Sequence, residues 1–137
     1  MNLEQAIHAH WAVDAELDAL LPVDRLTTGR GGTAAPHATL LIRAVRSTLP
    51  TNQGPALSEM AVRVTVWHDR YADAKMIVER IRERFDGASL ALSPSGRIAR
   101  LCHEADSIRQ HDDGHWQWTI DFKAKVCRLP QQPAEQA

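Results

Sequence analysis

The seven histidines of this 137-residue chain are its first candidates for chemistry, because imidazole is a common metal ligand. His8 and His10 lie two residues apart on a predicted helix, where side chains diverge by about 200° and cannot share a metal. His111 and His115 flank a predicted turn and could approach each other, but zinc usually requires three or four ligands. We therefore expect surface histidines, with no metal site and no cofactor.

Motifs for nucleophilic catalysis and phosphate binding are also incomplete. Cys102 and His103 are adjacent on a predicted strand and point to opposite faces, so they form no dyad. Like Cys102, Cys127 is expected to behave as a small apolar residue. The glycine cluster at residues 29–32 lacks the Lys-Ser/Thr of a phosphate-binding loop. The sequence therefore predicts no catalytic site.

The charge balance argues against strong nucleic-acid binding. The chain has 16 basic and 17 acidic residues, whereas proteins that grip phosphates normally show a basic excess. No apolar run approaches the roughly 20 residues that span a bilayer, so no membrane is expected. The first residues lack the basic and apolar regions of a signal peptide. We expect an intracellular protein with reduced cysteines.

Periodicity locates the elements of the first half. Apolar residues recur at helical spacing from residue 2 to residue 21, with one polar interruption, and Pro22 ends the helix. Asn2 and Gln5 form a capping-box pattern at its start. A short strand is expected at residues 23–28.

Two long loops separate the next strands. The first covers residues 29–36, and the second, Thr48–Ser58, joins strands at 37–47 and 60–68 in a long hairpin. Loops of this length in a compact domain are often binding segments, and simple surface disorder is the alternative.

The second half contains one further helix and three strands. The predicted elements are a helix at 70–85 with Asp69 as N-cap and a stop at Asp86-Gly87, strands at 89–92 and 97–110, a turn at 112–114, and a strand at 116–126 with unbroken alternation. The fold class is α+β, with an antiparallel sheet of about five to six strands, two helices packed on one face, and the order α-β-β-β-α-β-β-β. We expect one domain at residues 3–129 and a flexible C-terminal tail at 130–137.

Three tryptophans lie on predicted strands, at Trp67, Trp116 and Trp118. They either pack in the core beneath the helices or form a subunit interface, where aromatic residues are enriched.

This pattern resembles the tail-completion proteins of long-tailed phages, which include tail terminators and tail-to-head joining proteins. The likeness covers about residues 3–129. Its main carrier is the junction at residues 62–78, where the strand Val62-Arg63-Val64-Thr65-Val66-Trp67 runs directly into a helix with Tyr71-Ala72-Asp73-Ala74.

The resemblance implies a structural virion protein of a phage or prophage tail or neck, assembled in the host bacterial cytoplasm. It implies a homo-oligomeric ring, commonly a hexamer, that ends the tail tube and meets the tail tube protein and the head–tail connector protein. A domain of this length is roughly 37 Å across, so six in a ring leave a hole of roughly 37 Å and four leave about 15 Å. DNA, roughly 20 Å wide, passes through the lumen of six without specific binding.

The ring hypothesis names eight contact residues. Arg30, Gly31 and Gly32 are in the first loop, Asn52, Gln53 and Gly54 in the hairpin loop, and Lys123 and Lys125 on the last strand. The rival class is a small α+β ligand-binding domain or enzyme of unknown substrate, with His37, His68 or His103 as a polar group in a cavity.

Overall fold

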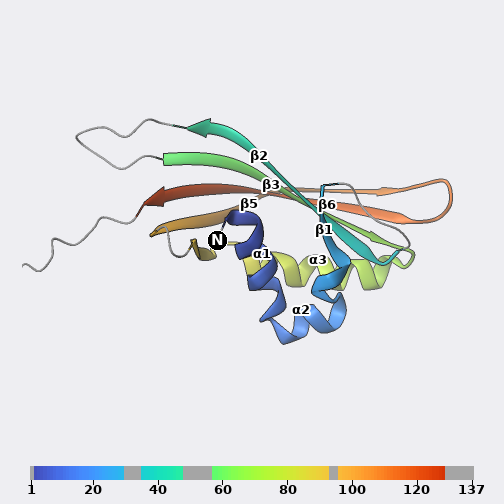
Figure 1. Ribbon diagram of the computed structural model, residues 1–137. Helices are drawn as coiled ribbons and strands as arrows, with labels where there is room; N and C mark the ends of the chain where they lie inside the picture. The colour runs from blue at the N-terminus through green and yellow to red at the C-terminus, as the bar shows by residue number, and fades with distance from the viewer. Residues whose placement is uncertain (1, 30–34, 48–56, 93–95, 129–137) are drawn as a thin grey trace, which may run out of the picture.

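Alternating apolar residues in several long segments favour a sheet, and the computed structural model shows a curled sheet of six strands with three α-helices (Figure 1). These counts apply to the residues that the structure describes, which are 2–29, 35–47, 57–92 and 96–128. In chain order the elements are α1 (Leu3–Ala12), α2 (Ala15–Leu20), the 3-10 helix η1 (Val23–Arg25), β1 (Leu26–Thr28), β2 (His37–Ser47), β3 (Leu57–His68), α3 (Tyr71–Phe85), β4 (Ser89–Leu92), β5 (Arg97–Gln110) and β6 (Trp116–Arg128). None of the helices in these ranges is long and apolar enough to cross a membrane.

The strands lie in the order β1-β2-β3-β6-β5-β4. All neighbours are antiparallel except β1 and β2, which are parallel, with Leu26 beside Ala38 and Thr28 beside Leu40. The α+β class and six strands are therefore confirmed, but the purely antiparallel sheet is wrong. A strand of three residues contains too little pattern to indicate its direction, which depends on where the following connection rejoins the sheet.

The N-terminal helical segment is divided in two at Asp14. The predicted capping box of Asn2 and Gln5 is present at the start of α1. The Asp14 carboxylate accepts a hydrogen bond from the Leu17 N–H at 2.9 Å and so begins a second helix. The prediction of one continuous helix over residues 2–21 is wrong, because the polar interruption is an N-cap.

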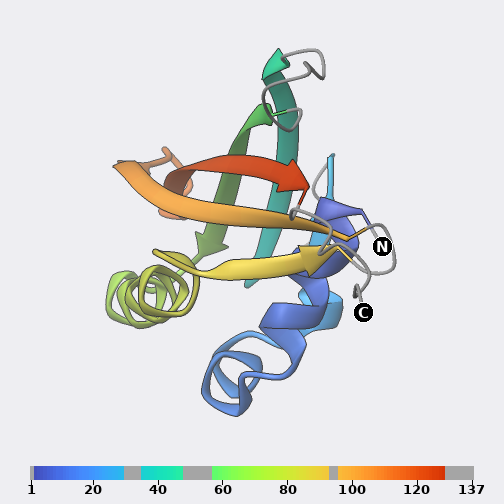
Figure 2. The same ribbon diagram turned by 90° about the vertical axis from the view of Figure 1, so that its left-hand side faces the viewer.

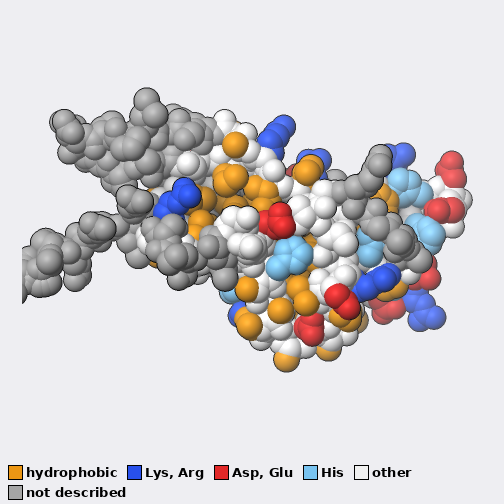
Figure 3. Space-filling view, in the orientation of Figure 1, with side chains coloured by type: hydrophobic (Ala, Val, Ile, Leu, Met, Phe, Trp, Pro, Cys, Tyr) orange, Lys and Arg blue, Asp and Glu red, His pale blue; other side chains and the backbone are white. Residues whose placement is uncertain are grey.

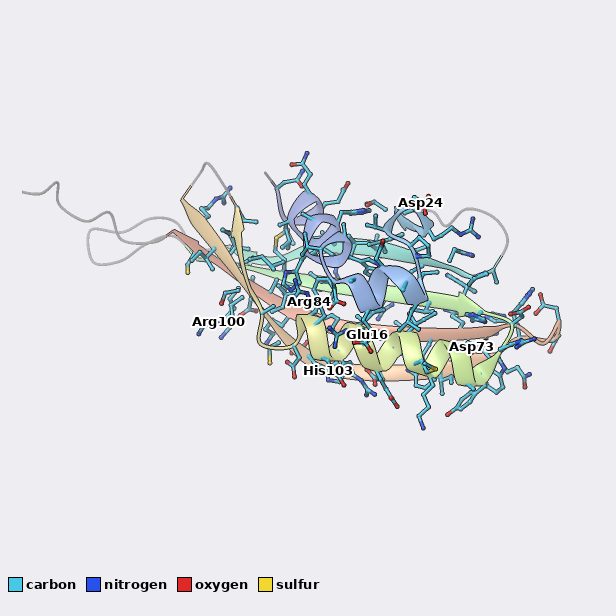
Figure 4. All side chains as sticks on the ribbon, turned by 90° about the horizontal axis from the view of Figure 1, so that it is seen from below. Glu16, Asp24, Asp73, Arg84, Arg100 and His103 are labelled. Carbon is cyan, nitrogen blue, oxygen red and sulfur yellow. The ribbon has the colours of Figure 1, made fainter. Side chains whose placement is uncertain are left out.

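Asp14 also forms a buried ion pair with the other helical segment. Its side chain is 2% exposed, and its Oδ2 accepts a hydrogen bond from Arg80 Nη2 of α3 at 2.6 Å. Arg84 Nε lies 3.5 Å from the same oxygen. Figure 4 labels Arg84 and Glu16, the latter on α2. The Arg80 hydrogen bond holds the pKa of the Asp14 carboxyl below its usual value, despite burial.

The helices do not form the expected two-helix layer. α1 packs against β4, α3 packs against β3, β5 and β6, and α2 contacts α1 and α3 (Figure 2). One apolar cluster joins all three helices to the inner face of the sheet. Its largest fully buried side chains include Trp11, Ile81 and Phe122. The curl of the sheet gives each helix a different set of strands to cover.

The start of α3 differs from the prediction in its cap. The helix follows β3 directly, as expected, but the N-cap is Arg70, which makes no side-chain capping bond. The Arg70 N–H instead donates to Nδ1 of His68 at 3.0 Å. Asp69 is therefore not the N-cap. His68 is the last residue of β3 and is buried, and its ring nitrogen accepts the hydrogen bond that an N-cap side chain would otherwise accept. The predicted stop at Asp86-Gly87 is confirmed, and Gly87 adopts a φ of 79°.

The alternation of β6 is confirmed along its length. Trp118, Ile120, Phe122, Ala124 and Val126 are all buried on the inner face. β6 pairs with β3 on one side and β5 on the other, so both of its edges are occupied. Its inner residues therefore form the middle of the core.

Substitution of Asp14 by asparagine tests the buried ion pair. At pH 7 we expect the free energy of unfolding to fall by about 2–4 kcal/mol, because Arg80 loses its buried partner and α2 loses a charged cap. The folded-state pKa of Asp14 is lowered, so its contribution is complete above the unfolded pKa of about 3.9 and is lost as the pH falls through the folded value. The difference from wild type, measured by urea denaturation from pH 7 to pH 2, should therefore shrink below about pH 4.

Glu16 provides the matched control, because its carboxylate contacts the same arginine at 3.2 Å but is 66% exposed. Glu16→Gln should change the free energy of unfolding by less than about 1 kcal/mol at every pH. Equal losses in the two variants would contradict the role assigned to Asp14.

Candidate assembly surfaces

Six of the eight predicted contact residues lie outside the described residues: Arg30, Gly31, Gly32, Asn52, Gln53 and Gly54. The structure describes where their segments leave the sheet. Gly29 donates its N–H to the Leu40 carbonyl at 2.8 Å, and Arg25 Nε donates to the Pro36 carbonyl at 3.0 Å. The connection from β1 to β2 is thus anchored at both ends beside the start of β2.

The second segment leaves from the opposite end of β2. Ser47 pairs with Ser58 across the β2–β3 ladder, so the described part of this hairpin ends close to that pair (Figure 1). The two segments therefore begin at opposite ends of one strand. A partner in contact with both would have to extend along the whole length of β2.

Lys123 and Lys125 both lie on the outer face of β6, as the alternation predicted. Lys123 Nζ is 3.5 Å from the Glu104 carboxylate of β5, so its charge has a partner within the chain. Lys125 is exposed, with Glu59 beside it on β3 and Arg100 beside it on β5. Their roles in contacts between subunits stay predictions.

An ion pair that the sequence analysis did not identify occupies the middle of the outer face. Arg63 of β3 donates from Nε and Nη2 to the two oxygens of Asp121 on β6, at 2.8 and 3.3 Å. This bonding raises the pKa of Arg63 above that of a free guanidinium. The pair lines a shallow hollow of about 210 Å³ together with Leu41, Arg43, Ala61 and Glu104, among others. The centre of the outer face is therefore close to neutral.

Aromatic rings are stacked on the outer face near the first residue of β2. The Trp67 ring of β3 lies between His37 of β2, at a centroid distance of 5.9 Å, and His111 beyond β5, at 5.7 Å. His111 Nε2 is 2.6 Å from the Gln117 side-chain oxygen. The stacked rings connect β2, β3 and the turn that follows β5. The sequence analysis left core packing and a subunit interface open for Trp67 and gave no indication of these neighbours.

The other two strand tryptophans lie on the inner face beside α3. The Tyr71 ring is 5.1 Å from Trp116 and 5.6 Å from Trp118, measured between centroids. Trp118 is 8% exposed, whereas Trp116 and Trp67 are only half-buried. Core packing therefore describes Trp118. The interface role stays open for Trp67 and Trp116.

The three histidines of the rival hypothesis are held by different partners. His37 stacks on Trp67, His68 accepts the Arg70 amide hydrogen bond, and His103 Nε2 is 2.5 Å from Asp106. Within the ranges that the structure describes, no group of three or more His, Cys, Asp or Glu residues is placed to hold a metal. In the described part of the chain each of these histidines therefore has contacts of its own, with no partner common to all three.

His8 and His10 also act separately. His8 Nε2 is 3.4 Å from the Thr28 hydroxyl, and His10 Nε2 is 3.0 Å from the Arg84 carbonyl. Burial lowers the pKa of His10, so its ring tends to be neutral. The His8 ring therefore contacts β1, and the His10 ring contacts α3.

Comparisons with known proteins support one family. The model of the family described as tail completion protein gp17 matches residues 5–126. A solved chain from the virion of a native gene transfer agent (GTA) particle shares the fold, with a TM-score of 0.61, 19% identity, and coverage of 91% of this chain and 94% of that chain. A second solved chain, whose description names no function, has a TM-score of 0.60 and 10% identity, with 93% and 98% covered. No curated protein matches in sequence.

The Arg63–Asp121 pair can be tested by a double-mutant cycle with alanine at each position. Both side chains are partly exposed, so we expect a coupling free energy of only about 0.2–1 kcal/mol by urea denaturation. Lys75 and Glu79, an exposed pair on α3, provide the comparison. A coupling of several kcal/mol would contradict the interpretation that this pair sets surface charge rather than stability.

Proposed function

The chain belongs to the tail completion protein gp17 family, since the family model matches residues 5–126, and from this premise we propose that it forms a ring, a hexamer, at the end of a phage-type tail. The chain is a structural protein of a phage tail. In the proposal, the ring terminates the tail tube and contacts the tail tube protein and the head–tail connector protein. It has no catalytic role.

The family match is the observation that carries the proposal. A second support is the shared fold of a chain that belongs to a virion particle. A third is the shape of the sheet, whose β2–β3 and β5–β6 hairpins end at opposite sides of the body (Figure 1). Subunits of this shape present one hairpin to a component above the ring and the other to a component below it.

The surface charge is compatible with passage of DNA through the ring. The chain carries a formal charge of −1, and the Arg63–Asp121 and Lys123–Glu104 pairs neutralise charges on the outer face. Since affinity for DNA rises with each phosphate that a protein neutralises, a nearly neutral lumen would retain the genome only weakly. The outer face of the sheet is our candidate for the lumen wall.

The proposed contacts beyond the ring are the two connecting segments. The residues around Arg30, Gly31 and Gly32 leave the start of β2, and those around Asn52, Gln53 and Gly54 leave its end. In this arrangement one segment reaches the component on each side of the ring. The proposal keeps one domain at residues 3–129 with a C-terminal tail at 130–137, which lies outside the described residues.

The mass of the purified protein in solution tests the ring. We expect light scattering after size exclusion, over a range of concentrations, to show a hexamer or a monomer that converts to one as concentration rises. Tails assembled with the tail tube protein should contain six copies at one end. Particles that assemble normally without this chain would overturn the proposed function.

Replacement of residues 52–54 by Ala-Ala-Ala tests the hairpin contact. We expect an unchanged urea midpoint, because the apolar core is formed by other, described residues, together with a loss of at least tenfold in the yield of joined particles. The same replacement at residues 30–32 tests the other segment, and Glu79→Ala on the exposed side of α3 is the surface control. Normal particle yields from both triple variants would show that neither segment makes the proposed contact.

A further inference from the structure

Each border of the sheet contains a stretch without a neighbouring strand. β1 pairs only with Ala38–Leu40, so within the described part of the chain no strand lies beside β2 from Leu41 to Ser47. On the opposite border β4 pairs with β5 only at Arg97–Arg100. These two open stretches lie on opposite sides of the molecule (Figure 2).

The open part of β5 begins after a short extension of its pairing. Leu101 exchanges backbone hydrogen bonds with Gly87 and Ala88, and the His103 N–H donates to the Asp86 carboxylate at 2.9 Å. Beyond these contacts residues 104–110 are exposed, except that the Asp106 side chain is only 21% exposed, and its carboxylate accepts a hydrogen bond from Arg82 Nη1 of α3 at 2.6 Å. Figure 4 labels Arg100 and His103, which bracket the point on β5 where this extension is made.

The side chains on these stretches are unusual for exposed borders. Leu41 and Val45 on β2 are 54% and 55% exposed, and Ile108 on β5 is 42% exposed. Figure 3 views the molecule from the β2 side and shows hydrophobic surface beside this border. Open strand edges with apolar side chains are templates for pairing with another chain, and monomeric proteins usually block them.

Register irregularities divide both stretches but leave a regular part in each. The β2 irregularity lies between Ala44 and Arg46, and the β5 irregularity lies between His103 and Ala105. Leu41–Ala44 and residues 105–110 are therefore regular extended backbone. A pair of four to six residues is close to the usual length of a strand.

The directions of the two strands permit them to pair between copies. The β2–β3, β3–β6 and β6–β5 ladders are all antiparallel, so β2 and β5 run in opposite directions within one sheet. A second copy placed beside the first with the same orientation would bring its β2 antiparallel to β5 of the first. The ladders place Leu41 level with Ala105, so pairing Leu41–Ala44 with residues 105–110 would displace the second copy along the strands by about four residues, roughly 13 Å at about 3.3 Å per residue.

We propose that Leu41–Ala44 of one copy pairs as an antiparallel strand with residues 105–110 of the next copy, and that this contact builds the ring. The inference rests on the proposed function and adds the surface that joins the subunits. The occupant is a second copy, because each chain supplies both halves of the contact and its two open strands run in opposite directions, as an antiparallel pair between copies in the same orientation requires. Such head-to-tail contacts close into rings when the rotation between copies permits. The displacement along the strands corresponds to the strand tilt that closes a sheet into a barrel.

The test is disulfide cross-linking between copies in a background with Cys102→Ser and Cys127→Ser. A cysteine replaces Leu41 or Arg43 on the outer side of β2, and a second replaces Ala105, Ser107 or Arg109 on the outer side of β5. A disulfide requires Cα atoms about 4.4–6.8 Å apart, so cysteines that are opposite each other in one register should cross-link on oxidation. We expect a ladder of bands up to the full ring under non-reducing electrophoresis, collapsing to monomer when reduced.

Ala61 gives the matched control. It lies on β3 directly beside Arg43 and on the same face, but one strand further from the border. Ala61→Cys combined with Ser107→Cys should give no ladder. As a second measurement, Leu41→Lys combined with Ile108→Lys should convert the oligomer to monomer while the urea midpoint stays within the range of exposed substitutions.

The failures are distinguishable when cross-linking is done both in solution and on assembled particles. If rings and particles form normally but no cysteine pair cross-links, and the lysine variant still assembles, the edge-to-edge contact is wrong and the ring proposal stands. If no ring is found in solution or on particles, the proposed function itself is wrong, and this inference with it.

Discussion

The pairing of β3 with β6 is the contact on which the rest of the structure depends. Twelve consecutive residue pairs, from Leu57 with Cys127 to His68 with Trp116, join strands that are about 60 positions apart in the chain. This ladder brings the sheet formed by the first half of the chain, β1-β2-β3, against that formed by the second half, β6-β5-β4. It also aligns Val64 with Ile120 and Val62 with Phe122, so the inner face becomes one continuous apolar surface. The helices then have a single surface to cover.

The same ladder determines the outer face. Because β3 and β6 alternate in register, Arg63 lies beside Asp121 and Trp67 lies beside Gln117. The first pair neutralises the centre of the outer face, and the second places a tryptophan within reach of His37 and His111. A shift of one residue in either strand would turn the outer side chains of that strand toward the core. The burial of the inner face therefore specifies the chemistry of the outer face.

The short border strands explain why the molecule fits an assembly. Among the described residues, β1 and β4 cover only part of β2 and β5, so the remaining edge backbone has no neighbouring strand there and is available to another chain. The curl of the sheet separates the two uncovered stretches and directs them to opposite sides (Figure 2). A closed ring would use both borders at once, whereas a two-fold dimer formed through one border would leave the other border of both copies unused.

Local chemistry determined most elements of this protein in advance. The strict alternation in β6, the capping box of α1 and the glycine after α3 are each contained in a few neighbouring residues, so the sequence alone predicts them. The resemblance at residues 62–78 likewise depends on a contiguous segment, and the family match confirms it. The candidate contact residues were predicted only as polar loops and exposed lysines, because their meaning depends on partners.

Tertiary structure alone decided the features that need residues distant in sequence. The role of Asp14 as a buried cap depends on Arg80, 66 positions away. The parallel direction of β1, the Arg63–Asp121 pair and the two open borders all follow from which strands become neighbours. Strand order reflects the competition between all apolar faces for one core, and no local pattern in the sequence contains the outcome of that competition.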